Sequence, residues 1–117
     1  MFFTSGSRGA NSENPEWDLH TGEGDRRYDE LVKFDPPFLV KPKVTAAIRG
    51  VDFLEGGGHR VHVGVKDVDL DHFQWEIVTW GDTKIWGAAV TWIAYDPRLE
   101  NFTTLIDLLK EHVDPKS

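Results

Sequence analysis

The sequence of 117 residues contains no cysteine. Disulfide bridges, thiolate metal sites and a cysteine nucleophile are therefore excluded, and the fold must rest on its hydrophobic core. Basic residues are also scarce, with 13 Lys and Arg against 20 Asp and Glu, which gives a net charge of −7. This charge argues against nucleic acid and against an anionic membrane surface as partners, because both are bound mainly through Lys and Arg.

Long apolar runs are missing as well. No stretch approaches the ~20 apolar residues of a membrane-spanning helix, so we expect no membrane insertion. Met1–Gly6 has neither the basic nor the apolar region of a signal peptide, which leaves a cytoplasmic location and unconventional secretion both open. The sequence has no GxSxG elbow, phosphate loop or nucleotide fingerprint, and no spacing marks a carboxylate pair. We therefore expect no enzyme, no metal and no other cofactor.

Alternation of apolar and polar residues is the main structural signal. In Arg60–Val65, for example, the three valines point one way while Arg60, His62 and Gly64 point the other. Residues 4–16 form either an irregular arm or an extended strand, and Glu16–His20 is a further possible strand. The remaining predicted strands are Leu31–Phe34, Lys43–Leu54, Arg60–Val65, Phe73–Trp80 and Lys84–Tyr95.

The connections between these strands are short and rich in glycine. Glu55–Gly58 is predicted to be a hairpin connection, and Gly81-Asp82 a second tight turn. Several short strands at this spacing, with no internal repeat and no βαβ alternation, indicate one antiparallel domain of the sandwich or barrel type.

The last residues change character. Asp96-Pro97 suits the start of a helix, and the apolar residues that follow recur at helical spacing up to Val113. We therefore predict a β domain over residues 1–96 and a helical tail over residues 97–117. The tail either caps an edge of a sheet or joins two further copies in a helical bundle.

Two tryptophans flank the predicted Gly81-Asp82 turn. Trp80 lies opposite in phase to Phe73, Trp75 and Ile77, so its indole is expected to leave the core side. An exposed indole offers a flat apolar face and an N–H donor, which together suit a sugar. Trp80 and Trp86 are equally well explained as core or subunit-interface residues from their spacing alone.

From about Leu31 to Tyr95 the chain resembles the H-type lectin domain family. The segments that carry the likeness are Val32–Phe34, Pro36–Phe38, Pro42–Val44, Gly50–Asp52, Arg60–Val63, Phe73, Trp80–Ile85 and Val90–Ala94. The resemblance implies a six-stranded antiparallel β-sandwich that assembles as a trimer. It also implies a shallow, metal-free site between subunits that selects galactose or N-acetylgalactosamine.

The resemblance assigns roles to six residues of this chain. Arg60 matches a sugar-contacting arginine that comes from the adjacent protomer, and Trp80 matches the tryptophan of the site. Trp86 stands where the family often has a tyrosine that packs on the sugar. Gly81 replaces a histidine of the snail members. Asp25, with Gly24, is the best placement for the family's aspartate, which binds the axial hydroxyl.

Two functional hypotheses follow. The first is a multivalent lectin without catalytic activity, whose partners are glycans of the galactose or N-acetylgalactosamine type. The second is an oligomerisation or protein-interaction module that has kept the sandwich and lost its sugar site, which Gly81 and the helical tail would favour. An accessory domain of a larger enzyme is a third, weaker alternative.

Overall fold

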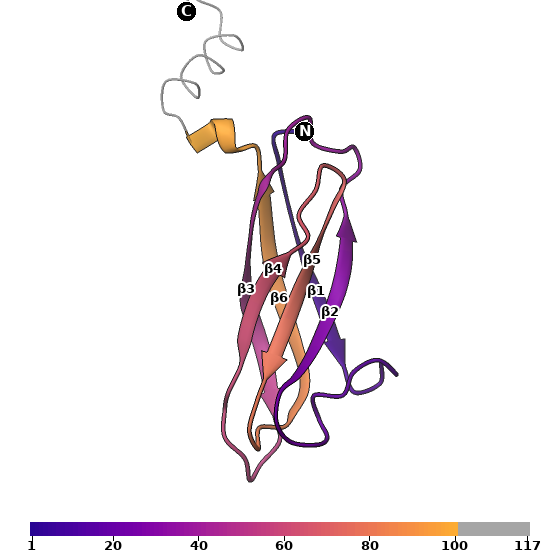
Figure 1. Cartoon of the computed structure of the whole chain (residues 1–117), viewed down its shortest axis with the longest axis vertical. Helices are drawn as coiled ribbons and strands as arrows, with labels where there is room; N and C mark the ends of the chain where they lie inside the picture. Colours follow the sequence, from indigo (N-terminus) through magenta and orange to yellow (C-terminus); the bar gives the residue numbers. More distant parts are fainter. Residues whose placement is uncertain (101–117) are drawn as a thin grey trace, which may run out of the picture.

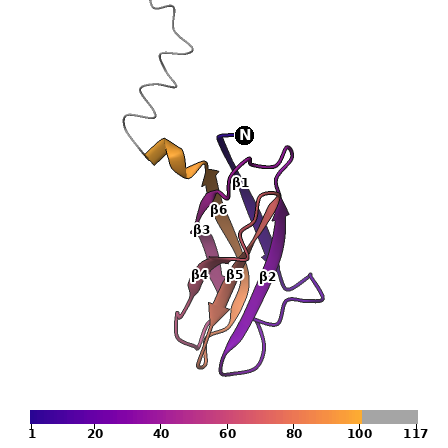
Figure 2. The ribbon, with the colours of Figure 1, turned by 45° about the horizontal axis from the view of Figure 1, so that its top comes forward.

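A computed structural model describes residues 1–100, which form two three-stranded sheets packed face to face (Figures 1 and 2). The strands are β1 (Phe3–Asn11), β2 (Arg26–Lys33), β3 (Lys43–Phe53), β4 (His62–Lys66), β5 (His72–Thr79) and β6 (Ile85–Tyr95). One sheet has the order β1–β6–β3 and the other β2–β5–β4, and all pairs are antiparallel. The prediction of an all-β, six-stranded antiparallel domain is confirmed.

The strands predicted from Lys43 onward are correct to within two residues at each end, whereas β2 begins at Arg26, five residues before the predicted start at Leu31. Residues 3–11 are a regular strand, β1, paired along its length with β6, so the extended alternative is the right one. Glu16–His20 is not a strand but an irregular segment with turns at both ends. Its two apolar side chains, Trp17 and Leu19, are buried all the same, and the Trp17 indole N–H donates to the Ile85 carbonyl at 2.9 Å.

The prediction of a hairpin at Glu55–Gly58 is wrong. This segment joins β3 to β4, which belong to different sheets, so the chain crosses from one layer to the other there. The Gly81-Asp82 turn likewise crosses between layers, from β5 to β6. Period-2 alternation identifies a strand with one buried face, but both sheets bury one face, so the pattern cannot tell which layer a strand enters.

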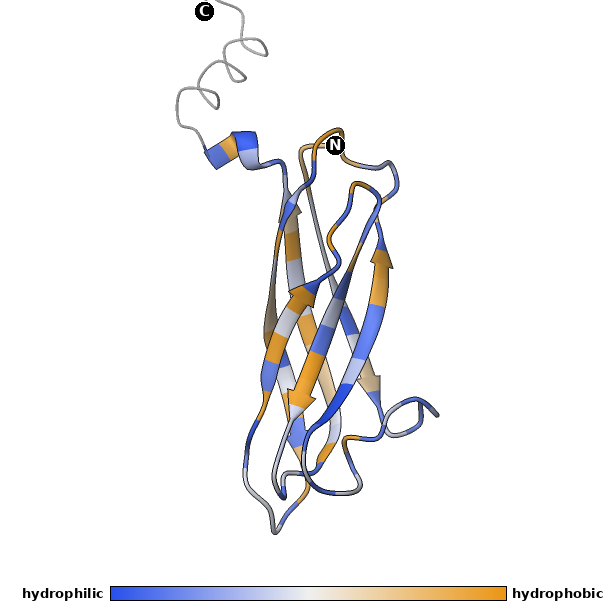
Figure 3. Ribbon diagram, in the orientation of Figure 1, coloured by the Kyte–Doolittle hydropathy of each residue, from blue (hydrophilic) through white to orange (hydrophobic). Residues whose placement is uncertain are grey.

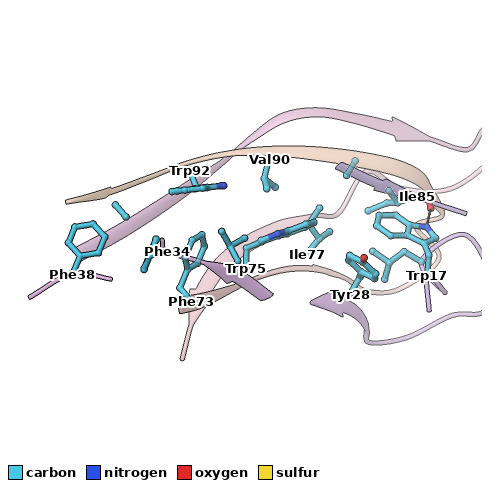
Figure 4. Packing of buried hydrophobic residues seen from close by; sticks show 14 residues of the cluster. Trp17, Tyr28, Phe34, Phe38, Phe73, Trp75, Ile77, Ile85, Val90 and Trp92 are labelled. Carbon is cyan, nitrogen blue, oxygen red and sulfur yellow. Dashed lines mark hydrogen bonds between the residues drawn. The ribbon is translucent and has the colours of Figure 1, made fainter. Parts of the chain in front are cut away.

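The core lies between the two sheets (Figure 4). Phe34 and Phe73 stack with their ring centroids 5.5 Å apart, and both rings meet Trp92 of the opposite sheet edge-on. Trp75 and Ile77 are fully buried next along β5. Figure 3 shows hydrophilic and hydrophobic bands along β5, where every second residue faces inward.

The structure describes only the first four residues of the predicted helical tail, Pro97–Glu100. Within residues 1–100 its start is a single 3-10 turn, Pro97–Glu100, rather than an α-helix, and the rest of the predicted tail lies outside the described residues. The Asp96 carboxylate accepts hydrogen bonds from the Arg98 backbone N–H and guanidinium, and these hydrogen bonds lower the pKa of Asp96. Among the described residues, no helix is long and apolar enough to cross a membrane.

Candidate carbohydrate-binding site

Three loops gather at one end of the sandwich, at the bottom of Figure 1. They are residues 12–25 between β1 and β2, residues 54–61 between β3 and β4, and residues 80–84 between β5 and β6. The Gly24 N–H donates to the Gly81 carbonyl at 2.9 Å, which joins the first loop to the third. The residues singled out from the sequence all lie in these loops or at the adjoining start of β6: Gly24, Asp25, Arg60, Trp80, Gly81 and Trp86.

Arg60 is fixed by its own chain. Its Nη1 donates to the Asp82 carboxylate at 2.7 Å, and the same carboxylate accepts from the Gly58 N–H at 3.1 Å. These hydrogen bonds, that from Gly58 first, hold the pKa of Asp82 below its usual value. The Arg60 side chain remains 43% exposed, so it can still donate to a ligand.

The glycines around this pair leave room for it. Gly81 has a φ of +67°, and a Cβ built there would lie 3.2 Å from Nη1 of Arg60. A Cβ at Gly57 would meet the Asp82 carbonyl oxygen at 2.5 Å, and one at Gly58 would overlap the Arg60 guanidinium. The glycines therefore allow residues 54–61 and residues 80–84 to pack closely against each other. Their role is to leave space for this contact, and not to make the connection flexible.

Two buried threonines hold the backbone of Arg60. The Thr79 hydroxyl donates to the Arg60 carbonyl at 2.6 Å, and the Thr83 hydroxyl accepts from the Arg60 N–H at 3.1 Å. Both threonines are fully buried, and they flank the Trp80–Asp82 turn. The backbone at Arg60 and the turn that carries Trp80 are thus tied into one rigid unit.

Sequence reasoning missed Arg26, which binds the loops together from inside. Its guanidinium donates only to backbone carbonyls, and these belong to the first and third loops. The five acceptors, at 2.7–3.3 Å, are Leu19, Thr21, Gly24, Gly81 and Thr83. The sequence pattern does not predict such a cluster of hydrogen bonds, because the acceptors are backbone groups that every residue carries.

Both candidate tryptophans are exposed. Trp80 follows the inward-facing Thr79 and is 41% exposed, which confirms that it leaves the core side. Trp86 is 48% exposed and meets His20 edge-on at 5.7 Å between ring centroids. It lies at a shift in register, where Asp52 pairs with Gly87 and Phe53 with Ile85, so Trp86 is an extra residue of β6. Such bulges redirect a side chain relative to the regular alternation.

The surface offers two hollows. One, of about 200 Å³, is lined by Asp25, Arg26, Arg27 and Val78. The larger, of about 540 Å³, lies on the outer face of the β1–β6–β3 sheet, over a floor that includes Gly9, Gly50 and Gly87. The site residues do not line the larger hollow, so its size does not make it the better candidate for sugar binding.

Exposed indoles, a fixed guanidinium and a nearby carboxylate at the loop end of a β-sandwich are the features of a shallow binding surface. Among residues 1–100, no group of three or more His, Asp or Glu side chains is placed to hold a metal ion. The fold is thus of the β-sandwich class, and the candidate site lies at its loop end.

Comparison with known proteins gives the family. Residues 30–95 match the H-type lectin domain, and the chain belongs to this family. The chain is also similar to the protein "ATP synthase subunits region ORF 7" of Fuscovulum blasticum, with 34% identity over 76 residues, which are 65% of this chain and 66% of that one.

Two solved structures of discoidin II of Dictyostelium discoideum, one native recombinant and one wild-type, share the fold. Each matches 80% of this chain with a TM-score of 0.67 and 21% sequence identity. The chain spans 37% and 36% of those two chains and just under two-thirds of the Fuscovulum protein.

Proposed function

We propose that the protein is a lectin without catalytic activity that binds glycans of the galactose or N-acetylgalactosamine type. The sugar lies at the loop end against Trp80 and Trp86, at the junction between subunits of a trimer. The observation that carries the proposal is the convergence of Trp80, Gly81 and Arg60, three positions matched to the family's sugar site, on one crosslinked surface.

The chemistry of these residues suits a neutral sugar. An indole packs on the apolar C–H face of a pyranose, while its N–H and the free donors of an Arg60, which the family takes from the adjacent protomer, reach hydroxyl oxygens. Asp25 is exposed and can accept hydrogen bonds from sugar hydroxyls. Because Arg60 is already held by Asp82 and the threonines, little side-chain freedom would be lost when a ligand binds.

The outer faces of the two sheets support self-association through one of them. On the β1–β6–β3 sheet, the three central rows of paired outward residues carry no charge: Ser5–Ile93–Thr45, Ser7–Thr91–Ala47 and Gly9–Ala89–Gly50. The one charged residue between them is the exposed Arg49, in the bulge of β3. On the β2–β5–β4 sheet, the outward residues include Arg27, Asp29, Lys66 and Glu76, which pair with one another. Interface cores are depleted in charge, so we place the subunit contact on the β1–β6–β3 face.

The test is a titration followed by intrinsic tryptophan fluorescence. Galactose and N-acetylgalactosamine are added to the wild-type protein, with glucose as the control sugar. A saturable change with the galacto-sugars alone is expected, and Trp80→Ala should abolish binding while the far-UV circular dichroism spectrum stays the same.

Other results would contradict the proposal. Equal responses to glucose would remove the selectivity for galacto-sugars. A silent titration followed by a silent glycan array, with the folded trimer confirmed by its mass, would leave the interaction module that has lost sugar binding as the function.

A further inference from the structure

The smaller hollow includes Val78 of β5, which precedes Trp80 by two residues, although Trp80 itself does not line it. Arg27 of β2 pairs with Val78 of β5, and both side chains leave the core side, as Trp80 does two residues further on. Val78 and Trp80 are about 7 Å apart along the strand, since each residue adds ~3.4 Å. The hollow of about 200 Å³ opens at this place, lined by Asp25, Arg26, Arg27 and Val78.

The accessible groups around the hollow are of three kinds. The Asp25 carboxylate is an exposed acceptor, and the Arg27 side chain, 60% exposed, is a donor. Between them the partly buried Val78 supplies an apolar floor. Arg26 also lines the hollow, but its guanidinium is engaged with five carbonyls and serves as structure.

Arg27 is available for a ligand. Its one ion pair among the described residues joins Nη1 to Glu76 at 3.5 Å, a long contact on an exposed side chain. Such surface pairs contribute little free energy, so a ligand oxygen at normal hydrogen-bond distance can compete with it. If Arg27 turned to a ligand, Glu76 would still pair with Lys66, whose Nζ lies 3.5 Å from the same carboxylate oxygen.

These groups favour a neutral polyhydroxyl unit over an ion. An anion at Arg27 would also face Asp25, and a cation at Asp25 would also face Arg27. Vicinal hydroxyls can donate to the carboxylate and accept from the guanidinium at once, while the C–H groups of a pyranose rest on Val78.

We propose that Arg27 and Val78 form a second sugar subsite, with the Asp25 carboxylate shared between the two units, and that this subsite takes the next unit of a glycan whose terminal galactose lies at Trp80. The inference rests on the proposed function and makes the preferred ligand a disaccharide or longer glycan. The extended glycan runs along β5, on the charged sheet face that the proposed subunit contact leaves open.

The experiment compares the affinity for galactose with the affinities for two galactose-terminated disaccharides, lactose and melibiose, by calorimetric titration. We expect the wild-type protein to bind at least one disaccharide about tenfold more tightly than galactose, the gain of one charge-assisted hydrogen bond. In Arg27→Ala the ratio of the two affinities should fall to about one. Val78→Phe, which fills the hollow, should lower the ratio in the same way.

Lys33→Ala is the matched control, since Lys33 is exposed on the same face of β2, six residues or about 20 Å from Arg27. It should keep the wild-type ratio. Galactose binding with no gain for either disaccharide would overturn the subsite and leave the proposed function in place. A gain that survives both Arg27→Ala and Val78→Phe would place the second unit elsewhere, and the absence of binding to all three sugars would overturn both proposals.

Discussion

The guanidinium of Arg60 lies over Gly81, in the space that a side chain at residue 81 would occupy. A Cβ there would be 3.2 Å from Nη1 of Arg60, and the positive φ of Gly81 disfavours any other residue. A side chain at residue 81, such as the histidine that the resemblance gives to the snail members, would require the Arg60 guanidinium to move by a few tenths of an ångström. Gly81 removes one polar group from the surface and allows Arg60 to pack on its own chain.

The pair formed by Arg60 and Asp82 should depend on pH in the acid range. The pKa of Asp82 is lowered in the folded protein, so the stabilisation is present above the pKa of an unfolded aspartate, about 3.9, and is lost as the pH falls through the folded value. An NMR titration of the Asp82 carboxyl should give a midpoint below 3.8. Arg60→Ala should move the midpoint upward, and a wild-type midpoint at or above 3.8 would contradict the arrangement.

Arg26→Gln should loosen the loop end while leaving the sandwich folded. The substitution removes a charged donor from five backbone carbonyls, and part-buried acceptors such as Thr83 O lose a hydrogen bond, at a cost of about 1–3 kcal/mol. Hydrogen exchange should accelerate in residues 19–25 and 80–84 more than in β5 and β6. Arg27→Gln, on the neighbouring residue, is the control and should leave the exchange of these loops unchanged.

Two glycines of the β1–β6–β3 sheet should respond in opposite ways to alanine. A Cβ at Gly6 would lie 2.7 Å from the buried Trp92 ring, so Gly6→Ala should destabilise the protein by about 1–3 kcal/mol through overpacking. A Cβ at Gly50 would have no atom within 4 Å, so Gly50→Ala should be nearly neutral. Urea denaturation measures both, and equal losses would show that the Trp92 contact does not decide the difference.

A negative charge in the middle of the three uncharged rows of the β1–β6–β3 sheet should prevent self-association. Thr91 lies at the centre of that face, between Ser7 and Ala47, and three copies of Thr91→Glu would bring carboxylates together at the contact. Sedimentation should give a trimer for the wild-type protein and a folded monomer for the variant. The matched change Gln74→Glu, on the other sheet, should leave the trimer intact, and a trimer of Thr91→Glu would place the contact on another surface.

Much of the fold could be predicted because each β-strand carries its own signal. The alternation in Phe73–Trp80 identifies both the buried face of β5 and the exposed position of Trp80, since side chains on a strand point to opposite sides in turn. Glu16–His20 misled for the same reason: Trp17 and Leu19 are spaced by two and buried, yet neither lies in a strand. A short alternating run reports burial more reliably than backbone conformation.

The sequence by itself determined the strands, their inward faces and the family, because these depend on local spacing and on short motifs. The tertiary structure decided which sheet each strand joins, since both layers bury one face and look alike along the chain. It also decided the hydrogen-bond partners of Arg26 and the packing of the Arg60 guanidinium against Gly81. The Arg26 contacts involve backbone carbonyls, and the Arg60 contact depends on the missing side chain of Gly81. Both join loops that are far apart in the sequence, so neither can be recognised from the pattern of side chains.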